Sequence, residues 1–312
     1  MRRTISFIRT WFASWFVFRR RDLTLTLMSE FSVVGMNAEH SEHPLPTPHL
    51  DVVVQGSGPA LLLAHGAGGG IVGNFGLVLD DLARDHTLIG PHYPGAGGSP
   101  AAAEPLDLDV LADQLVASAV AAGEESFAVL GESLGSAVAV RVATRHPARV
   151  RALVLTAGFP VADPVLALAA RLIKSLADMS YWEEVARLAC VSCLSRTDLA
   201  ELAPSDLDAL VAQTLAGMPP GMVDHFDLVS RVDVRADLAK VSAPTLVVAP
   251  MGDRLVLPDS SHRLAAGIAG AELIELPGAA HILNPVDRMT WLRHVRAFLS
   301  SLPASTNSST PV

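Results

Sequence analysis

The stretch that decides the fold is Phe127-Ala128-Val129-Leu130-Gly131-Glu132-Ser133-Leu134-Gly135, in which a short apolar run leads into a Gly-x-Ser-x-Gly pattern. The apolar residues 127–130 are typical of a buried strand, and residues 134–145 have helical spacing. We therefore expect Ser133 to lie on a sharp, strained turn between a strand and a helix. Gly131 and Gly135 fit this prediction, because side chains there would collide across so tight a turn.

Short apolar runs alternate with helical segments on both sides of this turn. The pattern predicts strands at 50–55, 60–64, 87–90, 127–130, 152–156, 245–249 and 272–276. It predicts helices at 74–84, 108–122, 134–145, 260–269 and 286–299. This alternation indicates an α/β fold with a mostly parallel, doubly wound sheet that helices cover on both faces.

Residues 160–240 interrupt the alternation. They contain no convincing strand and show helical patterns at 165–177, 181–195, 206–216 and 222–232. We predict that 160–240 form a helical cap over the carboxyl ends of the strands, where open α/β sheets bind ligands. Residues 49–159 and 241–302 would then form the α/β core. Residues 1–48 are expected to be a poorly ordered leader and linker, and 303–312 a disordered tail.

The first 27 residues combine apolar and aromatic side chains with six Arg. Three interpretations stay open: a translated leader upstream of a true start at Met28 or Met36, a basic amphipathic segment on a membrane surface, or a secretory signal that lacks a small-residue cleavage site. No apolar run reaches the roughly 18 residues of a spanning helix. We expect a cytoplasmic protein without a stable membrane span, although this segment leaves membrane association or export open.

Composition narrows the class of protein. The chain has 312 residues, of which 50% are apolar and 18% charged, so it has the material for a sizeable core and is not wholly disordered. Its net charge is −9. Because the first 27 residues contribute about +5, residues 28–312 carry −14, and so acidic a body argues against a nucleic-acid partner.

The sequence gives little evidence for a cofactor or metal site. The two cysteines, Cys190 and Cys193, cannot build a disulfide framework or a four-Cys zinc site, and we expect two packed thiols. Residues 68–73 match a dinucleotide fingerprint, Gly-x-Gly-x-x-Gly, but the next predicted strand runs into Pro91-His92-Tyr93 and lacks the acidic residue that binds ribose. We therefore predict neither a cofactor nor a metal.

A serine hydroxyl is a poor nucleophile at neutral pH unless a base takes its proton. His281 is the candidate base, because it follows the last predicted strand and precedes the final helix. His225 and His262 lie within helical patterns and are the weaker alternatives. The base itself needs a carboxylate that fixes its tautomer.

Asp253 is the candidate carboxylate, since it lies just past the predicted strand at 245–249. Asp163 is the runner-up, because it is the acidic residue nearest to the end of the preceding strand. Asp259 is expected to be a helix N-cap. For the transition-state charge we propose an oxyanion hole made of the backbone N–H groups of Ala67 and Leu134.

The loop His65-Gly66-Ala67-Gly68-Gly69-Gly70 supplies the first of these donors, and we expect His65 to brace it rather than to react. With Ser133, Asp253 and His281 in this order, the chain resembles the α/β-hydrolase superfamily over roughly residues 50–300. Residues 93–99 resemble the Pro-Gly-x-Gly-x-Ser loop of that family, and 244–253 and 278–285 resemble its acid and histidine segments.

The resemblance implies an eight-stranded sheet with a Ser-His-Asp triad and a helical cap. Ser133 at the elbow argues against the dehalogenases and epoxide hydrolases of the superfamily, whose nucleophile is a carboxylate. The chain departs from the pattern at His92, where many relatives have Asp, and this leaves the local polarity of the pocket open.

These features together predict a serine hydrolase that forms an acyl-enzyme with an ester, thioester or lactone of a small apolar molecule. The same triad would also serve a biosynthetic cyclase or acyltransferase. A ligand-binding member with little turnover, and a cofactor-free haloperoxidase side reaction, are further alternatives. We expect a small molecule as the substrate, and the sequence does not predict the oligomeric state.

Overall fold

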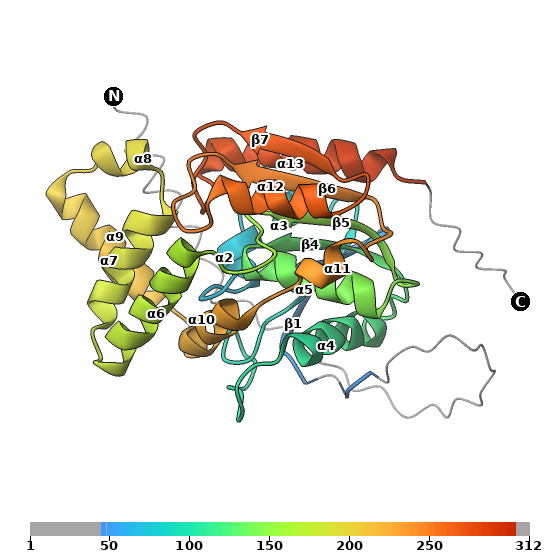
Figure 1. Ribbon diagram of the computed structural model, residues 1–312, viewed down its shortest axis with the longest axis horizontal. Helices are drawn as coiled ribbons and strands as arrows, with labels where there is room; N and C mark the ends of the chain where they lie inside the picture. Colours follow the sequence, from blue (N-terminus) through green and yellow to red (C-terminus); the bar gives the residue numbers. More distant parts are fainter. Residues whose placement is uncertain (1–44, 48, 304–312) are drawn as a thin grey trace, which may run out of the picture.

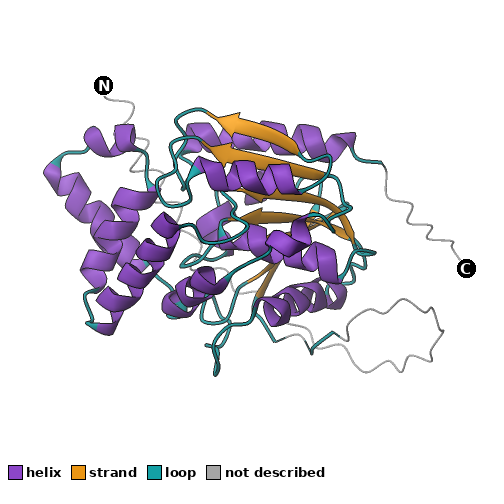
Figure 2. Cartoon of the chain, in the orientation of Figure 1, coloured by secondary structure: helices purple, strands orange, loops and turns teal. Residues whose placement is uncertain are grey.

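The computed structural model describes residues 45–47 and 49–303 (Figure 1). The predictions for most of the leader and the tail, with Met28 and Met36, lie outside the described residues. A central sheet is flanked by helices (Figure 2). Its strands are β1 (Val52–Gly56), β2 (Ala60–Ala64), β3 (Thr87–Pro91), β4 (Phe127–Glu132), β5 (Val150–Thr156), β6 (Thr245–Pro250) and β7 (Glu272–Leu276).

The sheet is parallel except at one edge. Its seven strands have the order β1-β3-β2-β4-β5-β6-β7, and only β1 runs antiparallel to its neighbour, β3. The prediction of a mostly parallel sheet is confirmed. The eight strands that the family resemblance implied are a correction: within the described residues a single strand precedes β2, so the antiparallel edge consists of β1 alone.

The inner strands are buried because helices cover both faces of the sheet, whereas the edge strands β1 and β7 are partly exposed and carry polar residues. All five residues of β2 and all six of β4 are buried. Since side chains alternate along a strand, Leu61 and Leu63 pack on one face, and Leu62 and Ala64 on the other. The sheet therefore separates two apolar cores, and its position is fixed from both sides.

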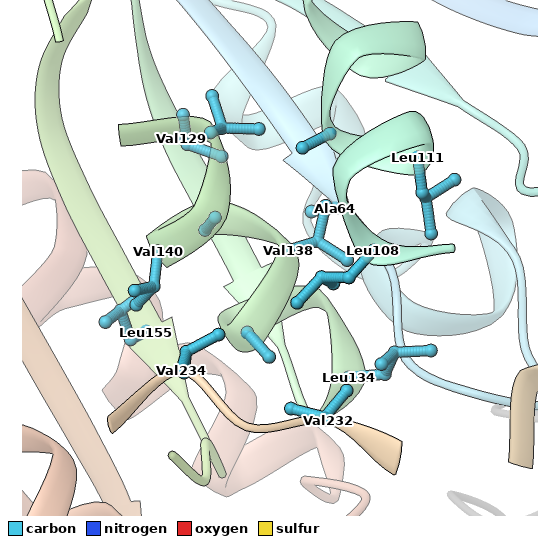
Figure 3. Close-up of a cluster of buried hydrophobic side chains, with 14 of the residues drawn as sticks. Ala64, Leu108, Leu111, Val129, Leu134, Val138, Val140, Leu155, Val232 and Val234 are labelled. Carbon is cyan, nitrogen blue, oxygen red and sulfur yellow. The ribbon is translucent and has the colours of Figure 1, made fainter. Parts of the chain in front are cut away.

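Different helices build the two cores. One face packs against α4 (Leu108–Ala121), α5 (Leu134–Arg145) and α12 (Pro258–Gly267). The opposite face packs against α2 (Ile71–Phe75), α3 (Leu79–Leu82) and α13 (Pro285–Ser301). Figure 3 shows part of the first core, where Leu134, Val138 and Val140 of α5 lie among side chains from the sheet and from α4.

Two local predictions were wrong. The single helix expected at 74–84 is divided into α2 and α3, with Gly76 as the C-cap of α2. Asp259 does not cap α12, because the helix begins at Pro258, two residues before the predicted start, and Leu257 is the N-cap. Proline suits the first helical position, where its missing N–H costs nothing, and Asp259 consequently lies inside the first turn.

Six helices lie between β5 and β6. They are α6 (Pro164–Asp178), α7 (Trp182–Cys193), α8 (Arg196–Ala200), α9 (Pro204–Ala216), α10 (Met222–Arg231) and α11 (Arg235–Leu238). The first five, α6 to α10, lie beyond the carboxyl ends of the strands, whereas α11 packs against α5 and α12 (Figure 1). Helix α6 packs on α7 and α10, and α7 packs on α9. The short helices α8 and α11 were not predicted. Within the described part of the chain, no helix is both long enough and apolar enough to cross a membrane.

Candidate active site

Ser133 lies on the turn between β4 and α5, as predicted. Its backbone has φ +54° and ψ −120°, a conformation that L-residues rarely adopt. A Cβ atom at Gly131 would lie 2.3 Å from the carbonyl oxygen of Gly135, and one at Gly135 would lie 1.9 Å from that of Ala64. Only glycine fits at either position, so the two glycines permit the turn that presents the serine.

His281 and Asp253 form a hydrogen-bonded pair. His281 Nδ1–H donates to Asp253 Oδ2 over 2.7 Å, and the carboxylate side chain is fully buried. The other carboxylate oxygen, Oδ1, accepts the backbone N–H groups of Leu255 and Val256, each over 2.9 Å. These bonds hold the carboxylate still and leave the Nε2 atom of His281 as the proton acceptor.

The pKa of His281 is raised above its ordinary value by its neighbours. Burial alone would lower that pKa, but the charge of Asp253, its hydrogen bond and the charge of Glu132 together favour the protonated ring by more. Stabilisation of the protonated ring helps a general base, because the ring must take up a proton and then release it within one reaction.

One cavity of about 210 Å³ brings Ser133 and His281 together. The Ser133 hydroxyl makes no hydrogen bond to the His281 ring within the described residues; both groups line the same space. The cavity extends from the strand ends to α6, α7, α9 and α10. The predicted residues Ser133, Asp253 and His281, distant in sequence, therefore meet at one place.

The predicted oxyanion loop follows β2 and passes over the nucleophile. A Cβ atom at Gly66 would lie 3.2 Å from the Cβ of Ser133. Ala67 lines the cavity, and Leu134 is the first residue of α5. The backbone N–H groups of Ala67 and Leu134 have no acceptor among the described residues, which leaves both donors available to a bound anion.

His65 fixes the start of this loop. Its Nδ1–H donates to the carbonyl of Gly66 over 2.8 Å, and its Nε2 accepts the backbone N–H of Tyr93 over 2.9 Å. Its ring also stacks on the ring of Tyr93, with centroids 3.7 Å apart. Burial and the nearby His225 hold the pKa of His65 well below its usual range, so the ring stays neutral and keeps both bonds.

His225 holds the same loop from the other side, a contact that the sequence did not indicate. It is buried on α10, where Nε2–H donates to the carbonyl of Pro94 over 2.9 Å and Nδ1 accepts the N–H of Gly68 over 3.3 Å. Both ring nitrogens are engaged, so His225 is poorly placed to act as a base. His262, the other alternative, lies on α12 and bonds Glu275 over 2.9 Å.

The other residues that the sequence analysis singled out lie outside the triad. Asp163 caps α6 by accepting the N–H of Leu166 over 2.9 Å, and it also accepts the hydroxyl of Ser260. Cys190 and Cys193 are free, buried thiols on α7, as predicted. His92 is buried beside the loop with its Nδ1 unpaired among the described residues.

Glu132, directly before the nucleophile, was missed by the sequence reasoning. It is buried, and it is bonded to Arg288 of α13 and to Asn74 of α2. Only the elbow pattern itself pointed to this position. Its second residue can be any amino acid, so the pattern carries no information about partners 58 and 156 residues away.

Known proteins are similar to this chain. It is 28% identical to the pyrrolizixenacetamide deacetylase of Xenorhabdus hominickii, over 77% of this chain and 91% of that protein. It is 32% identical to a pimeloyl-[acyl-carrier protein] methyl ester esterase of Neisseria meningitidis, over 71% of this chain and 70% of the relative. It is 31% identical to the polyketide synthase ThaQ of Burkholderia thailandensis, over 85% of this chain but only 12% of that protein.

The crystal structure of a hydrolase from Pseudomonas aeruginosa PA01 has a similar fold, with a TM-score of 0.70 and 26% identity over 80% of this chain and 94% of that one. The model of the α/β hydrolase fold family matches residues 59–287, which is most of the described chain. With this match, and with the elbow, the sheet order and the inserted helices, the chain belongs to the α/β hydrolase fold family.

Proposed function

We propose that this protein is a serine hydrolase that cleaves ester-type bonds through an acyl-enzyme on Ser133. The observation that carries the proposal is the 2.7 Å hydrogen bond between His281 and Asp253. The imidazole of His281 lines the same cavity as Ser133, which lies on a strained turn. A base that is oriented by a buried carboxylate is what a serine hydroxyl needs in order to attack a carbonyl.

In the first half of the reaction, His281 Nε2 accepts the proton of Ser133 as its Oγ attacks the acyl carbon. The tetrahedral intermediate carries a negative oxygen, and the N–H groups of Ala67 and Leu134 would donate to it. Removal of one such donor costs about 3 kcal/mol of transition-state stabilisation in well-studied enzymes. The imidazolium, stabilised by Asp253, then protonates the leaving alcohol or thiol.

In the second half, a water molecule attacks the acyl-enzyme. His281 takes a proton from this water, and the acyl group leaves as a carboxylic acid while Ser133 recovers its proton from the ring. Asp253 orients the ring throughout, because it accepts the Nδ1–H of His281 while two backbone N–H groups hold its other oxygen in place.

The inserted segment 160–240 would act as a cap that selects the substrate. Its contribution to the cavity wall is largely apolar and includes Ile173, Val185, Leu188, Met222 and Phe226. Charged side chains in the lining are confined to Glu132 and Arg288 at the sheet end, and these two form an ion pair. Such a wall favours an ester, thioester or lactone whose substituents are small, uncharged and apolar.

The names of the relatives agree with ester-type chemistry, since one is a deacetylase and another a methyl ester esterase. The similarity to part of a polyketide synthase favours a second candidate, in which a nucleophile within the acyl chain replaces water and closes a ring. The same Ser133, His281 and Asp253 would serve both reactions, so only the product distinguishes them.

The test is a panel of esters, thioesters and lactones with wild type and Ser133→Ala, analysed by product mass. We expect free acids from wild type and no turnover from the variant. Ring products would favour the second candidate. Tight binding of a panel compound without acyl turnover would contradict both, as would halogenation as the sole activity.

A further inference from the structure

A buried carboxylate lies beside the nucleophile, and the mechanism above does not use it. Glu132 is the last residue of β4, directly before Ser133, and only 7% of its surface is exposed. An ionised carboxylate is costly to bury unless charges and hydrogen bonds compensate it. The residues that contact Glu132 therefore show how its buried charge is compensated.

Arg288 provides the compensating charge. Its Nη1–H and Nη2–H groups donate to the two carboxylate oxygens of Glu132, the second over 3.3 Å. Arg288 is itself buried, and its guanidinium lies 4.9 Å from the ring centre of Trp291. The indole N–H of Trp291 donates to Thr156 Oγ1 over 2.7 Å, so the ion pair is anchored to the end of β5 as well.

Asn74 provides the third contact. Its Nδ2–H donates to Glu132 Oε2 over 3.2 Å. The same amide lies against the oxyanion loop: a Cβ atom at Gly69 would lie 2.5 Å from Asn74 Oδ1, and one at Gly66 would lie 3.3 Å from Asn74 Nδ2. The backbone N–H of Asn74 also bonds the carbonyl of Gly70 over 2.9 Å.

Glu132 is thus linked to three segments of the proposed site: the nucleophile, the oxyanion loop and the histidine segment. It is adjacent in sequence to Ser133, it bonds the residue that supports the oxyanion loop, and it bonds the helix α13 that begins after His281. A shift of about 1 Å in any of these segments is enough to cost a large factor in rate.

We propose that Glu132 is a positioning residue for acyl transfer at Ser133: through its bonds to Asn74 and Arg288 it fixes the relative positions of the nucleophile, the oxyanion loop and the histidine segment. The inference rests on the proposed function. It assigns Glu132 a part in the reaction without contact between its side chain and the substrate.

The negative charge of Glu132 also helps to raise the pKa of His281, and its removal therefore has an effect of definite sign. Asp253 in the loop after β6 bonds the His281 ring, and Glu132 of β4 and Arg288 of α13 line the same cavity as that ring. Cys193 of α7 stays uncharged, because burial raises the pKa of its thiol far above neutrality. Replacement of Glu132 by Gln removes a negative charge that attracts the imidazolium while the positive charge of Arg288 remains, so the protonated ring is disfavoured.

The experiment measures kcat, KM and the pH profile of kcat/KM for Glu132→Gln on the best ester of the panel. We expect the acid limb to move to lower pH by about half a unit or more, with kcat reduced on the order of tenfold and KM within roughly twofold of wild type. Glu132→Asp, which restores the charge, should return the limb toward its wild-type position.

A second variant separates geometry from charge. Asn74→Ala keeps the ion pair but removes the support of the oxyanion loop, so kcat should fall while the acid limb stays in place. Glu125→Gln is the matched control, because Glu125 is paired with Arg149 at the exposed end of β4. Its profile should match that of wild type.

An acid limb that does not move in Glu132→Gln would overturn the electrostatic claim, and an unchanged kcat in Asn74→Ala would overturn the positioning claim. If Glu132→Gln does not fold, Glu132→Asp and Asn74→Ala still decide the positioning claim through kcat. Failure of the proposed function looks different, since wild type itself would then give no acyl turnover.

Discussion

The imidazole of His281 donates its Nδ1 hydrogen to Asp253 Oδ2 across 2.7 Å, although 28 positions separate the two residues in sequence. Asp253 follows β6 and His281 follows β7, and these strands are parallel neighbours. Because the carboxyl ends of parallel strands meet at one edge of a sheet, the loops that follow them lie side by side. The topology thus produces the pair, and the pair fixes which nitrogen of the ring faces the cavity.

Asp253→Asn should abolish most of the activity without unfolding the protein. An amide of the same size can donate to the imidazole and thereby stabilise the wrong tautomer, and it cannot support the imidazolium. We expect kcat to fall on the order of 10⁴-fold, measured on the preferred ester, with an unchanged circular dichroism spectrum. Asp163→Asn is the control, because Asp163 caps α6 instead. A comparable kcat loss in that variant would contradict our assignment of the acid.

Activity should fall as the pH is lowered through the pKa of His281. The base must be neutral to accept the proton of Ser133, and its neighbours raise its pKa above the ordinary value of about 6.5. The acid limb of kcat/KM should therefore lie above pH 6.5, with a slope of one proton. A profile that stays flat down to pH 5 would rule out His281 as the base.

Substitution of the three histidines considered as bases should reduce activity to different extents. His281→Phe removes the base and should lose nearly all activity. His225→Phe removes two hydrogen bonds that hold the loops at Gly68 and Pro94, so kcat should fall on the order of tenfold to a hundredfold. His262→Phe on α12 should behave as wild type. If His225→Phe were as inactive as His281→Phe, the bracing account of His225 would be wrong.

Gly135→Ala should destabilise the fold rather than strengthen the helix. In an open helix, alanine is more stable than glycine by about 1 kcal/mol. Here the added methyl would lie 1.9 Å from the carbonyl oxygen of Ala64, so β2 and α5 must move apart. We expect the free energy of unfolding in urea to drop by about 3 kcal/mol. An unchanged or increased value would show that the contact between β2 and α5 is not tight.

Much of this molecule was predictable because its elements obey local rules. The strand at β2 and the helix at α5 were found at their observed bounds, since a continuous apolar run and a helical period are properties of neighbouring residues. The edge at which Ser133, Asp253 and His281 meet followed from the rule for parallel strands. Where local signals conflict, as at Pro258 and Asp259, the prediction of the helix start was wrong.

The unpredicted parts depend on contacts between distant segments. Glu132 reads as the free position of a five-residue pattern, yet its partner Arg288 is 156 residues away. His225 reads as one polar residue on an amphipathic helix, and its bond to Gly68 exists only because α10 packs against the loop after β2. Neither contact has a periodic or spacing signal, so folded coordinates were needed to find them.

The identity of the nucleophile is the central claim, and covalent labelling tests it most directly. Wild type, Ser133→Ala and Ser192→Ala would be treated with a fluorophosphonate, and the labelled peptide identified by mass spectrometry. Ser192 also lines the cavity but lies on α7, away from the elbow. We predict one label on Ser133 in wild type and in Ser192→Ala, and none in Ser133→Ala. A label that persists in Ser133→Ala, or that maps to another residue of wild type, would contradict the account.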